Sequence, residues 1–133
     1  MTGENRHRNA GAELERARAC LAEARTLRDA GLPYGAASRA YYAVFHGAQA
    51  LLYSAGIEAR THRGVIGLIG DHFVKPGALT PETGRMLSRM QRDREDADYV
   101  TGAVFTVAEA EEMVAAAETF LAAVEGLLAD KPG

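Results

Sequence analysis

Histidines and arginines are the residues of this sequence whose chemistry could act on a phosphodiester. RNA cleavage needs a group that takes the ribose 2′-proton, a group that protonates the leaving oxygen, and positive charge at the phosphate. Histidine is the usual proton carrier because its pKa lies near neutral pH. His46 is the candidate for proton transfer and Arg94 for the phosphate contact, while Tyr99 could donate a proton but is a poor base at neutral pH.

A second set of residues could bind a ligand rather than react with it. Arg39, Tyr42, His46 and Gln49 are spaced by three and four residues, so they share one face of a helix. The spacing alone favours a hydrated face, because buried Arg and His are unusual unless they are paired. The alternative is a polar cluster inside the fold or at a subunit interface.

A basic stripe follows in the next part of the chain. Arg85, Arg89 and Arg92 recur at positions i, i+4 and i+7, beside Arg94 in the sequence. A solvated helix face is the ordinary explanation, and a surface for RNA or an acidic partner is the alternative.

The candidate catalytic residues also have a structural interpretation. Arg94 and Asp98 are four residues apart, the spacing of an ion pair within a helix. Tyr99 and His46 would then complete a hydrogen-bonded cluster in the core. The sequence favours this interpretation over a catalytic site, because strongly interacting polar networks are often structural.

His62 follows Thr61 where a loop is expected to meet a helix, so a local hydrogen bond at the helix start is its expected role. With His46 and His72 it could form a metal site, but the chain lacks paired ligand spacings such as H-E-x-x-H or C-x-x-C. We therefore expect no metal and no cofactor. The single cysteine, Cys20, is expected to be a packing residue.

Helices are the elements that must position these residues. Residues 33–53 predict the central helix, because Pro33 suits a first helical turn and apolar residues recur at helical spacing. Similar patterns predict helices over 10–30, from residue 81 toward Arg94, and after the capping box at Thr106, with a short helix beginning near residue 61 or 62. Gly64, Gly67 and Gly70 in that short helix indicate close packing or a poorly formed helix.

Length and composition are those of one soluble globular domain. The chain has 133 residues, a net charge of −3 and 47% hydrophobic residues, so bulk charge does not attract nucleic acid. We expect a disordered tail over residues 1–9, a helical domain over 10–129 and a frayed end over 130–133. No apolar run is long enough to cross a membrane and the first residues lack a signal-peptide core, so a cytoplasmic location is expected.

Three phrases of the sequence resemble the HEPN superfamily, and within it the UPF0332-type branch. They are SRAYYAVFHGA at 38–48, THRG at 61–64 and REDADY at 94–99. The resemblance implies an all-α, antiparallel up-and-down bundle of four main helices plus one short helix. It also implies a homodimer.

The resemblance implies two kinds of function. Many HEPN proteins are metal-independent endoribonucleases, and others are partners of small nucleotidyltransferases in toxin–antitoxin or defence pairs. In the ribonuclease branches, an arginine that Arg94 matches is followed by a histidine, but here that window holds Tyr99, Val100 and Thr101. We therefore expect a component that binds RNA or a nucleotide or a protein partner. The alternatives are a ribonuclease that uses Arg94 with His46 or Tyr99, and a purely structural dimer.

Overall fold

Helices form the whole of the fold that the structure describes. A computed structural model describes the backbone of residues 2–99 and 105–129, and the side chains of residues 2–95 and 105–129. Within these ranges there are five α-helices and one π-helical turn, and no strand. The predicted all-α bundle with one short helix is therefore confirmed.

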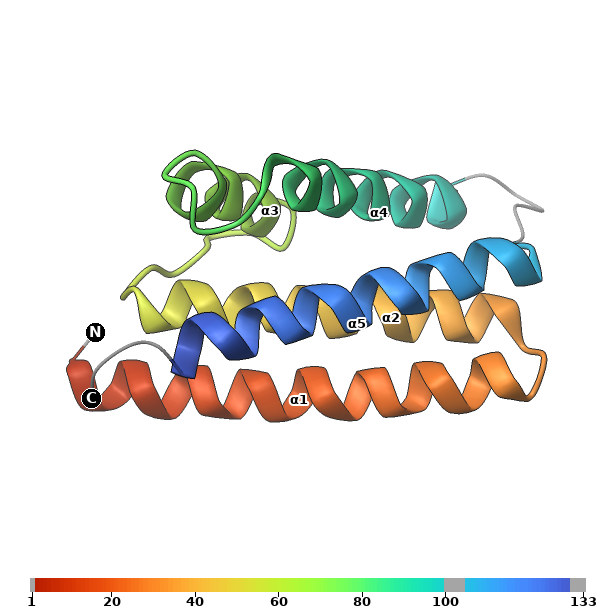
Figure 1. Cartoon of the computed structure of the whole chain (residues 1–133), viewed down its shortest axis with the longest axis horizontal. Helices are drawn as coiled ribbons and strands as arrows, with labels where there is room; N and C mark the ends of the chain where they lie inside the picture. The colour runs from red at the N-terminus through yellow and green to blue at the C-terminus, as the bar shows by residue number, and fades with distance from the viewer. Residues whose placement is uncertain (1, 100–104, 130–133) are drawn as a thin grey trace.

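The first two helices form a long antiparallel hairpin (Figure 1). Helix α1 spans Gly3–Asp29 and helix α2 spans Pro33–Ser54. The chain reverses at Gly31, whose φ of +74° is a conformation that glycine adopts without strain. Helix α1 begins at Gly3, inside the segment expected to be a disordered tail, because the Thr2 side chain accepts a hydrogen bond from the Asn5 backbone N–H and caps it.

Helix α2 is the centre of the molecule, as the sequence predicts. It packs against α1 on one side and against α5, which spans Val107–Ala129, on another. Most of the buried residues of α2 are alanine or glycine, so the neighbouring helices approach closely. A Cβ added at Gly47 would lie 2.7 Å from Cδ2 of Leu121 and 3.4 Å from Cε2 of Phe120. The two helices therefore meet where α2 has no side chain.

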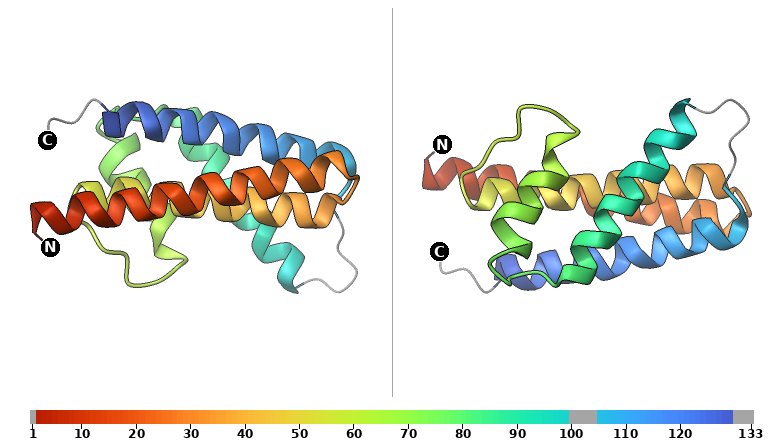
Figure 2. Two further views of the ribbon diagram at one scale, coloured as in Figure 1. Left: turned by 90° about the horizontal axis from the view of Figure 1, so that it is seen from below. Right: turned by 90° about the horizontal axis from the view of Figure 1, so that it is seen from above.

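The remaining elements form a second layer above α2 and α5 (Figures 1 and 2). Helix α3 spans Gly64–Ile69, the π-helical turn η1 spans Gly70–Val74, and helix α4 spans Pro81–Tyr99. Figure 2 shows that α4 crosses α2 and α5 obliquely, whereas α1, α2 and α5 run nearly along one axis. A Cβ on Gly67 or Gly70 would meet nothing within 4 Å, so an irregular helix, not close packing, accounts for these glycines.

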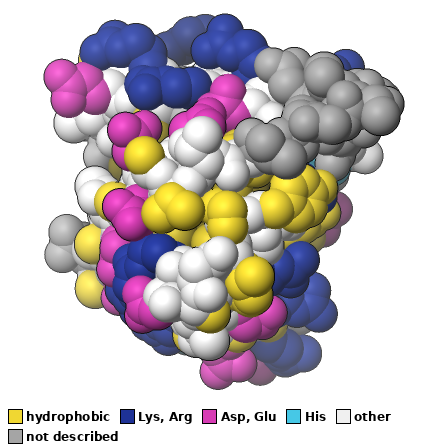
Figure 3. Space-filling view, turned by 90° about the vertical axis from the view of Figure 1, so that its right-hand side faces the viewer, with side chains coloured by type: hydrophobic (Ala, Val, Ile, Leu, Met, Phe, Trp, Pro, Cys, Tyr) yellow, Lys and Arg dark blue, Asp and Glu magenta, His cyan; other side chains and the backbone are white. Residues whose placement is uncertain are grey.

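Two large apolar residues are exposed at one end of the bundle. Tyr34 is 47% exposed and Val107 is 52% exposed, and both stand at the first turn of a helix. Leu32, in the turn before α2, is also exposed. Figure 3 shows hydrophobic side chains gathered in the middle of this end of the molecule.

Candidate functional site

His62 lies against the aromatic side chains of α2. Its ring stacks on Phe45 with 3.8 Å between the ring centroids and 21° between the planes. Tyr42 approaches the same imidazole edge-on at 6.3 Å. The loop before α3 thus places His62 on α2, and the Thr61 hydroxyl, which accepts a hydrogen bond from the Gly64 N–H, holds the start of the short helix. The predicted loop-to-helix position is confirmed, but the local bond comes from Thr61.

Two guanidinium groups converge on the Tyr42 ring. The Cζ of Arg39, on the same helix, lies 5.0 Å from the ring centroid, and the Cζ of Arg94, on α4, lies 5.6 Å from it. Both distances are within the range of cation–π attraction. Arg94 also donates a long hydrogen bond, 3.4 Å, to the Tyr34 hydroxyl. Helix α4 therefore places Arg94 beside the face of α2 that carries Tyr42 and Phe45.

His46 is held by a carboxylate from α1. Its Nδ1 lies 2.6 Å from Oε2 of Glu13, and the two side chains are only 20% and 14% exposed. Arg16 approaches the other carboxylate oxygen at 3.9 Å. When a neutral imidazole donates its Nδ1–H to a carboxylate, its Nε2 keeps a lone pair that can accept a proton. Glu13 therefore orients His46 and leaves its second nitrogen available as an acceptor.

The electrostatics of this cluster favour the neutral form of His62. Partial burial lowers its pKa from the ordinary value, and repulsion by the protonated form of His46 and by Arg94 lowers it further. Since the residue still has exposed surface, its ring can meet a ligand from solution. At neutral pH the imidazole is thus an uncharged flat surface that can stack or accept a hydrogen bond.

The comparisons with known proteins agree with this architecture. The model of the HEPN domain family matches residues 11–127. The chain belongs to the HEPN domain family. A "UPF0332 protein" of Thermotoga maritima is 35% identical over 86% of this chain and 87% of that protein. A Methanocaldococcus jannaschii protein named "Putative toxin MJ0605" is 37% identical over 76% of this chain and 75% of its own length.

The HEPN fold brings together several of the residues that the sequence singles out. Arg39, Tyr42, His46 and His62 gather with Arg94 around the outer face of α2. The face that spacing predicted to be hydrated is therefore partly buried. Gln49 on this face even has its Oε1 buried without a hydrogen-bond partner in the part of the chain that the structure describes.

Other predicted site residues do not join this cluster. Arg89 and Arg92 line a groove between α4 and the α3–η1 segment, so they do not continue a basic surface from Arg94. Arg94 is two positions beyond Arg92, which places it on the opposite side of a helix with 3.6 residues per turn. The side chains of Asp98 and Tyr99 lie outside the described residues, so the ion pair of Arg94 with Asp98 and the role of Tyr99 stay predictions.

Glu13 is the partner of His46 that the sequence did not indicate. As a charged residue in a helical stretch, it is expected on the polar side of the first helix. It falls, however, three residues after buried Ala10 and four before buried Ala17, in register with the buried face. A carboxylate in register with buried alanines was the signal that it faces a partner inside the fold.

The residues that the structure describes include neither a metal-binding cluster nor a membrane-spanning helix. Among them, no three His, Cys, Asp or Glu side chains lie close enough to hold a metal ion together. None of the described helices combines the length and the apolar character needed to cross a membrane.

Proposed function

We propose that this HEPN protein is the toxin-side component of a two-protein system and binds RNA at its aromatic–histidine surface. This surface consists of Tyr42, Phe45 and His62 with the guanidinium groups of Arg39 and Arg94. One observation carries the proposal: two guanidinium groups converge on Tyr42 beside an imidazole that stacks on Phe45. Positive charge and flat rings together are what single-stranded RNA requires.

The two kinds of group have separate tasks in this proposal. Arg39 and Arg94 bind phosphate oxygens, which guanidinium groups contact with two parallel hydrogen bonds. His62, exposed at the edge of the cluster, offers its ring to a base. Because the whole chain carries a net charge of −3, long-range attraction does not supply the affinity. Binding instead depends on this local concentration of cations and rings.

The biological setting is part of the same proposal. Two Methanocaldococcus jannaschii relatives have the word toxin in their names, and the family resemblance implies toxin–antitoxin or defence pairs. We assign this chain to such a pair in the cytoplasm, as a homodimer with a minimal nucleotidyltransferase as its partner. Co-purification of the neighbouring gene product, and a mass in light scattering of twice one chain, are the expected results.

RNA binding is tested by fluorescence anisotropy with a labelled single-stranded RNA. Removing the ring in His62→Ala should weaken binding by about 1–3 kcal/mol, the usual value of base stacking. Arg94→Ala should weaken binding to all sequences and reduce the slope of log K against log salt by about 1. Arg92→Ala is the matched control, since it removes the same charge from the other side of α4. Equal losses in Arg92→Ala and Arg94→Ala would contradict a specific surface, and no binding by the unaltered protein would contradict the proposal.

A second candidate function is metal-independent RNA cleavage, and the Glu13–His46 pair favours it. His46, with Nδ1 held by Glu13 at 2.6 Å, would accept the 2′-hydroxyl proton at Nε2. The 2′-oxygen would then attack phosphorus, the 5′-oxygen would leave and take a proton from water, and Arg94 would stabilise the charge on the phosphate. His46 would thereby replace the histidine that is missing after Arg94.

The cleavage candidate makes a distinct prediction. Purified protein in EDTA should cut total RNA and leave 2′,3′-cyclic phosphate ends, and both His46→Ala and Arg94→Ala should abolish cutting. Glu13→Gln should reduce the rate without abolishing RNA binding, because it acts through His46. If the protein binds RNA but does not cleave it, His46 is not a catalytic base and the site only binds RNA.

A further inference from the structure

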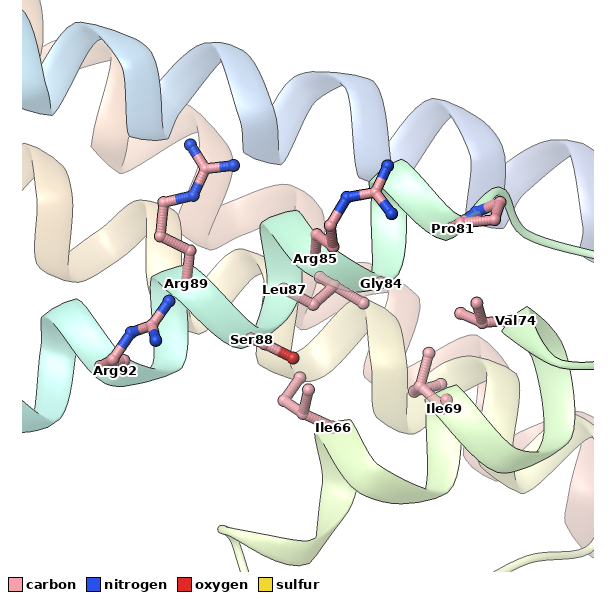
Figure 4. Close-up of a pocket in the computed structure, with 11 residues that line it drawn as sticks. Ile66, Ile69, Val74, Pro81, Gly84, Arg85, Leu87, Ser88, Arg89 and Arg92 are labelled. Carbon is pink, nitrogen blue, oxygen red and sulfur yellow. The ribbon is translucent and has the colours of Figure 1, made fainter.

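A groove runs between α4 and the α3–η1 segment, apart from the aromatic–histidine surface. Its volume is about 510 Å³, within the range of ligand and peptide sites. Aliphatic side chains form its floor: Ile66 and Ile69 from α3, Val74 from η1 and Leu87 from α4. Figure 4 shows these residues facing one another across the space between the two elements.

Three arginines of α4 line the same groove. Arg85, Arg89 and Arg92 span seven residue-to-residue steps, or about 10 Å of helix. None of their guanidinium groups forms a hydrogen bond or an ion pair with the side chains that the structure describes, whereas exposed arginines of α1 such as Arg18 and Arg25 do. Figure 4 shows the three guanidinium groups extending away from the floor, and Figure 3 shows Lys and Arg side chains along the edge of the molecule where α4 lies.

We infer that this groove is the docking site for an acidic amphipathic segment of a partner protein. A segment with carboxylates along one edge and aliphatic side chains along the other would complement both parts of the groove. The carboxylates would pair with Arg85, Arg89 and Arg92, and the aliphatic side chains would fill the space beside Ile66 and the half-buried Val74.

The lining of the groove favours a protein segment over RNA. Bases stack on aromatic rings, and none of the residues that line this groove is aromatic. Aliphatic floors instead receive the apolar side chains of a helix or an extended peptide. The inference goes beyond the proposed RNA surface and does not depend on it, because Arg94 and the arginines of the groove lie on opposite sides of α4.

Two glycines provide a matched pair of variants. Gly70 lines the groove, and a Cβ there would meet nothing within 4 Å, so Gly70→Leu should place a side chain in the groove without disturbing the protein. Gly67 is also helical and its added Cβ would also meet nothing, but it does not line the groove. Gly67→Leu is therefore the control. Circular dichroism checks that both variants fold.

The experiment uses a display library of random 16-residue peptides. Peptides that bind the full chain are kept, and those that also bind the Gly70→Leu variant are removed. The expected peptides combine Asp or Glu with Leu, Ile or Val. A selected peptide should bind Gly70→Leu and the Arg85→Ala/Arg92→Ala double variant at least about tenfold more weakly in calorimetry, and Gly67→Leu equally well. Added salt should weaken the complex with the unaltered chain.

Several results would overturn the inference. They are the absence of acidic amphipathic peptides after selection, or peptides that bind Gly70→Leu as well as Gly67→Leu. A loss of RNA binding in the Arg85→Ala/Arg92→Ala variant would assign the groove to RNA. A loss of dimer mass in that variant, measured by light scattering, would assign it to a second copy of the chain. The peptide and light-scattering readouts are independent of whether RNA binds at His62.

Discussion

At the scale of single residues, His62 connects a loop to the central helix through contacts with the rings of Tyr41, Tyr42 and Phe45. Its pKa is lowered in the folded protein, first by burial and then by repulsion from the protonated form of His46 and from Arg94. An unfolded chain has the ordinary value of about 6.5, so in the window below it the unfolded state binds more protons. The free energy of unfolding should therefore decrease as the pH falls through this window.

Urea denaturation at pH 7.5 and pH 5.5 measures this effect. The loss of stability on acidification should be smaller in His62→Gln than in the unaltered protein, because Gln does not take up a proton. His72→Gln, which changes an exposed histidine on η1 outside the cluster, is the control. An identical pH response in His62→Gln and the unaltered protein would show that the packing around His62 does not favour its neutral form.

The residue scale is also where sequence reasoning reaches its limit. His46 and Arg94 could be selected as candidates from their chemistry and from the family resemblance. The partner of His46 could not, because Glu13 is 33 residues away and spacing reports only on residues of the same helix. Similarly, the pattern of Arg85, Arg89 and Arg92 showed a stripe but not the aliphatic floor beside it, which comes from another element.

At the scale of helices, the contact between α2 and α5 depends on a missing side chain. Gly47→Ala would add a methyl group 2.7 Å from Leu121 Cδ2, and both Leu121 and Phe120 are buried. Overpacking of this kind costs about 1–3 kcal/mol, against a gain of up to about 1 kcal/mol from helix propensity. A net loss of stability is therefore expected in urea denaturation.

Gly11→Ala is the matched control for that measurement. Gly11 is an exposed position inside α1, and an added Cβ meets nothing within 4 Å. Here only the higher helix propensity of alanine has an effect, so the free energy of unfolding should rise by about 0.5–1 kcal/mol. If both substitutions stabilise the protein, Gly47 is not in close contact with Leu121 and Phe120.

The start of α5 is held by a reciprocal pair of hydrogen bonds. The Thr106 N–H donates to Glu109 Oε1 at 3.0 Å, and the Glu109 N–H donates to Thr106 Oγ1 at 3.1 Å, which confirms the predicted capping box. Thr106→Ala should lower the free energy of unfolding by about 1 kcal/mol, whereas Thr106→Ser should keep most of the stability because serine also has a hydroxyl group. Equal stability of the Ala and Ser variants would contradict a role for the hydroxyl.

Local sequence signals located most helices because they act within one turn. Pro33 marks the start of α2, Gly31 marks the turn before it, and Thr106 with Glu109 marks α5. The first turns of α1 were not predicted, because residues 3–9 have no apolar residues at helical spacing that would indicate a buried face. Only the Thr2 cap signals that start, and a single threonine is weak evidence.

At the scale of the whole molecule, one core joins both layers. Phe120 is completely buried in this core. Phe120→Ala should reduce the free energy of unfolding by about 3–5 kcal/mol, a large part of the 5–15 kcal/mol typical of a domain. Leu127→Ala, at a half-buried position on the same helix, should cost less. Similar losses in both variants would contradict the deeper burial of Phe120.

The position of α5 in the chain affects the protein while it is being made. Helices α1 and α2 are synthesised early and can pair as a hairpin, but the side of α2 that receives Phe120 and Leu121 stays in water until α5 has left the ribosome. An uncovered apolar strip on a nascent chain attracts chaperones and other unfinished chains. The time taken to translate the intervening residues therefore sets how long each new molecule is vulnerable to aggregation.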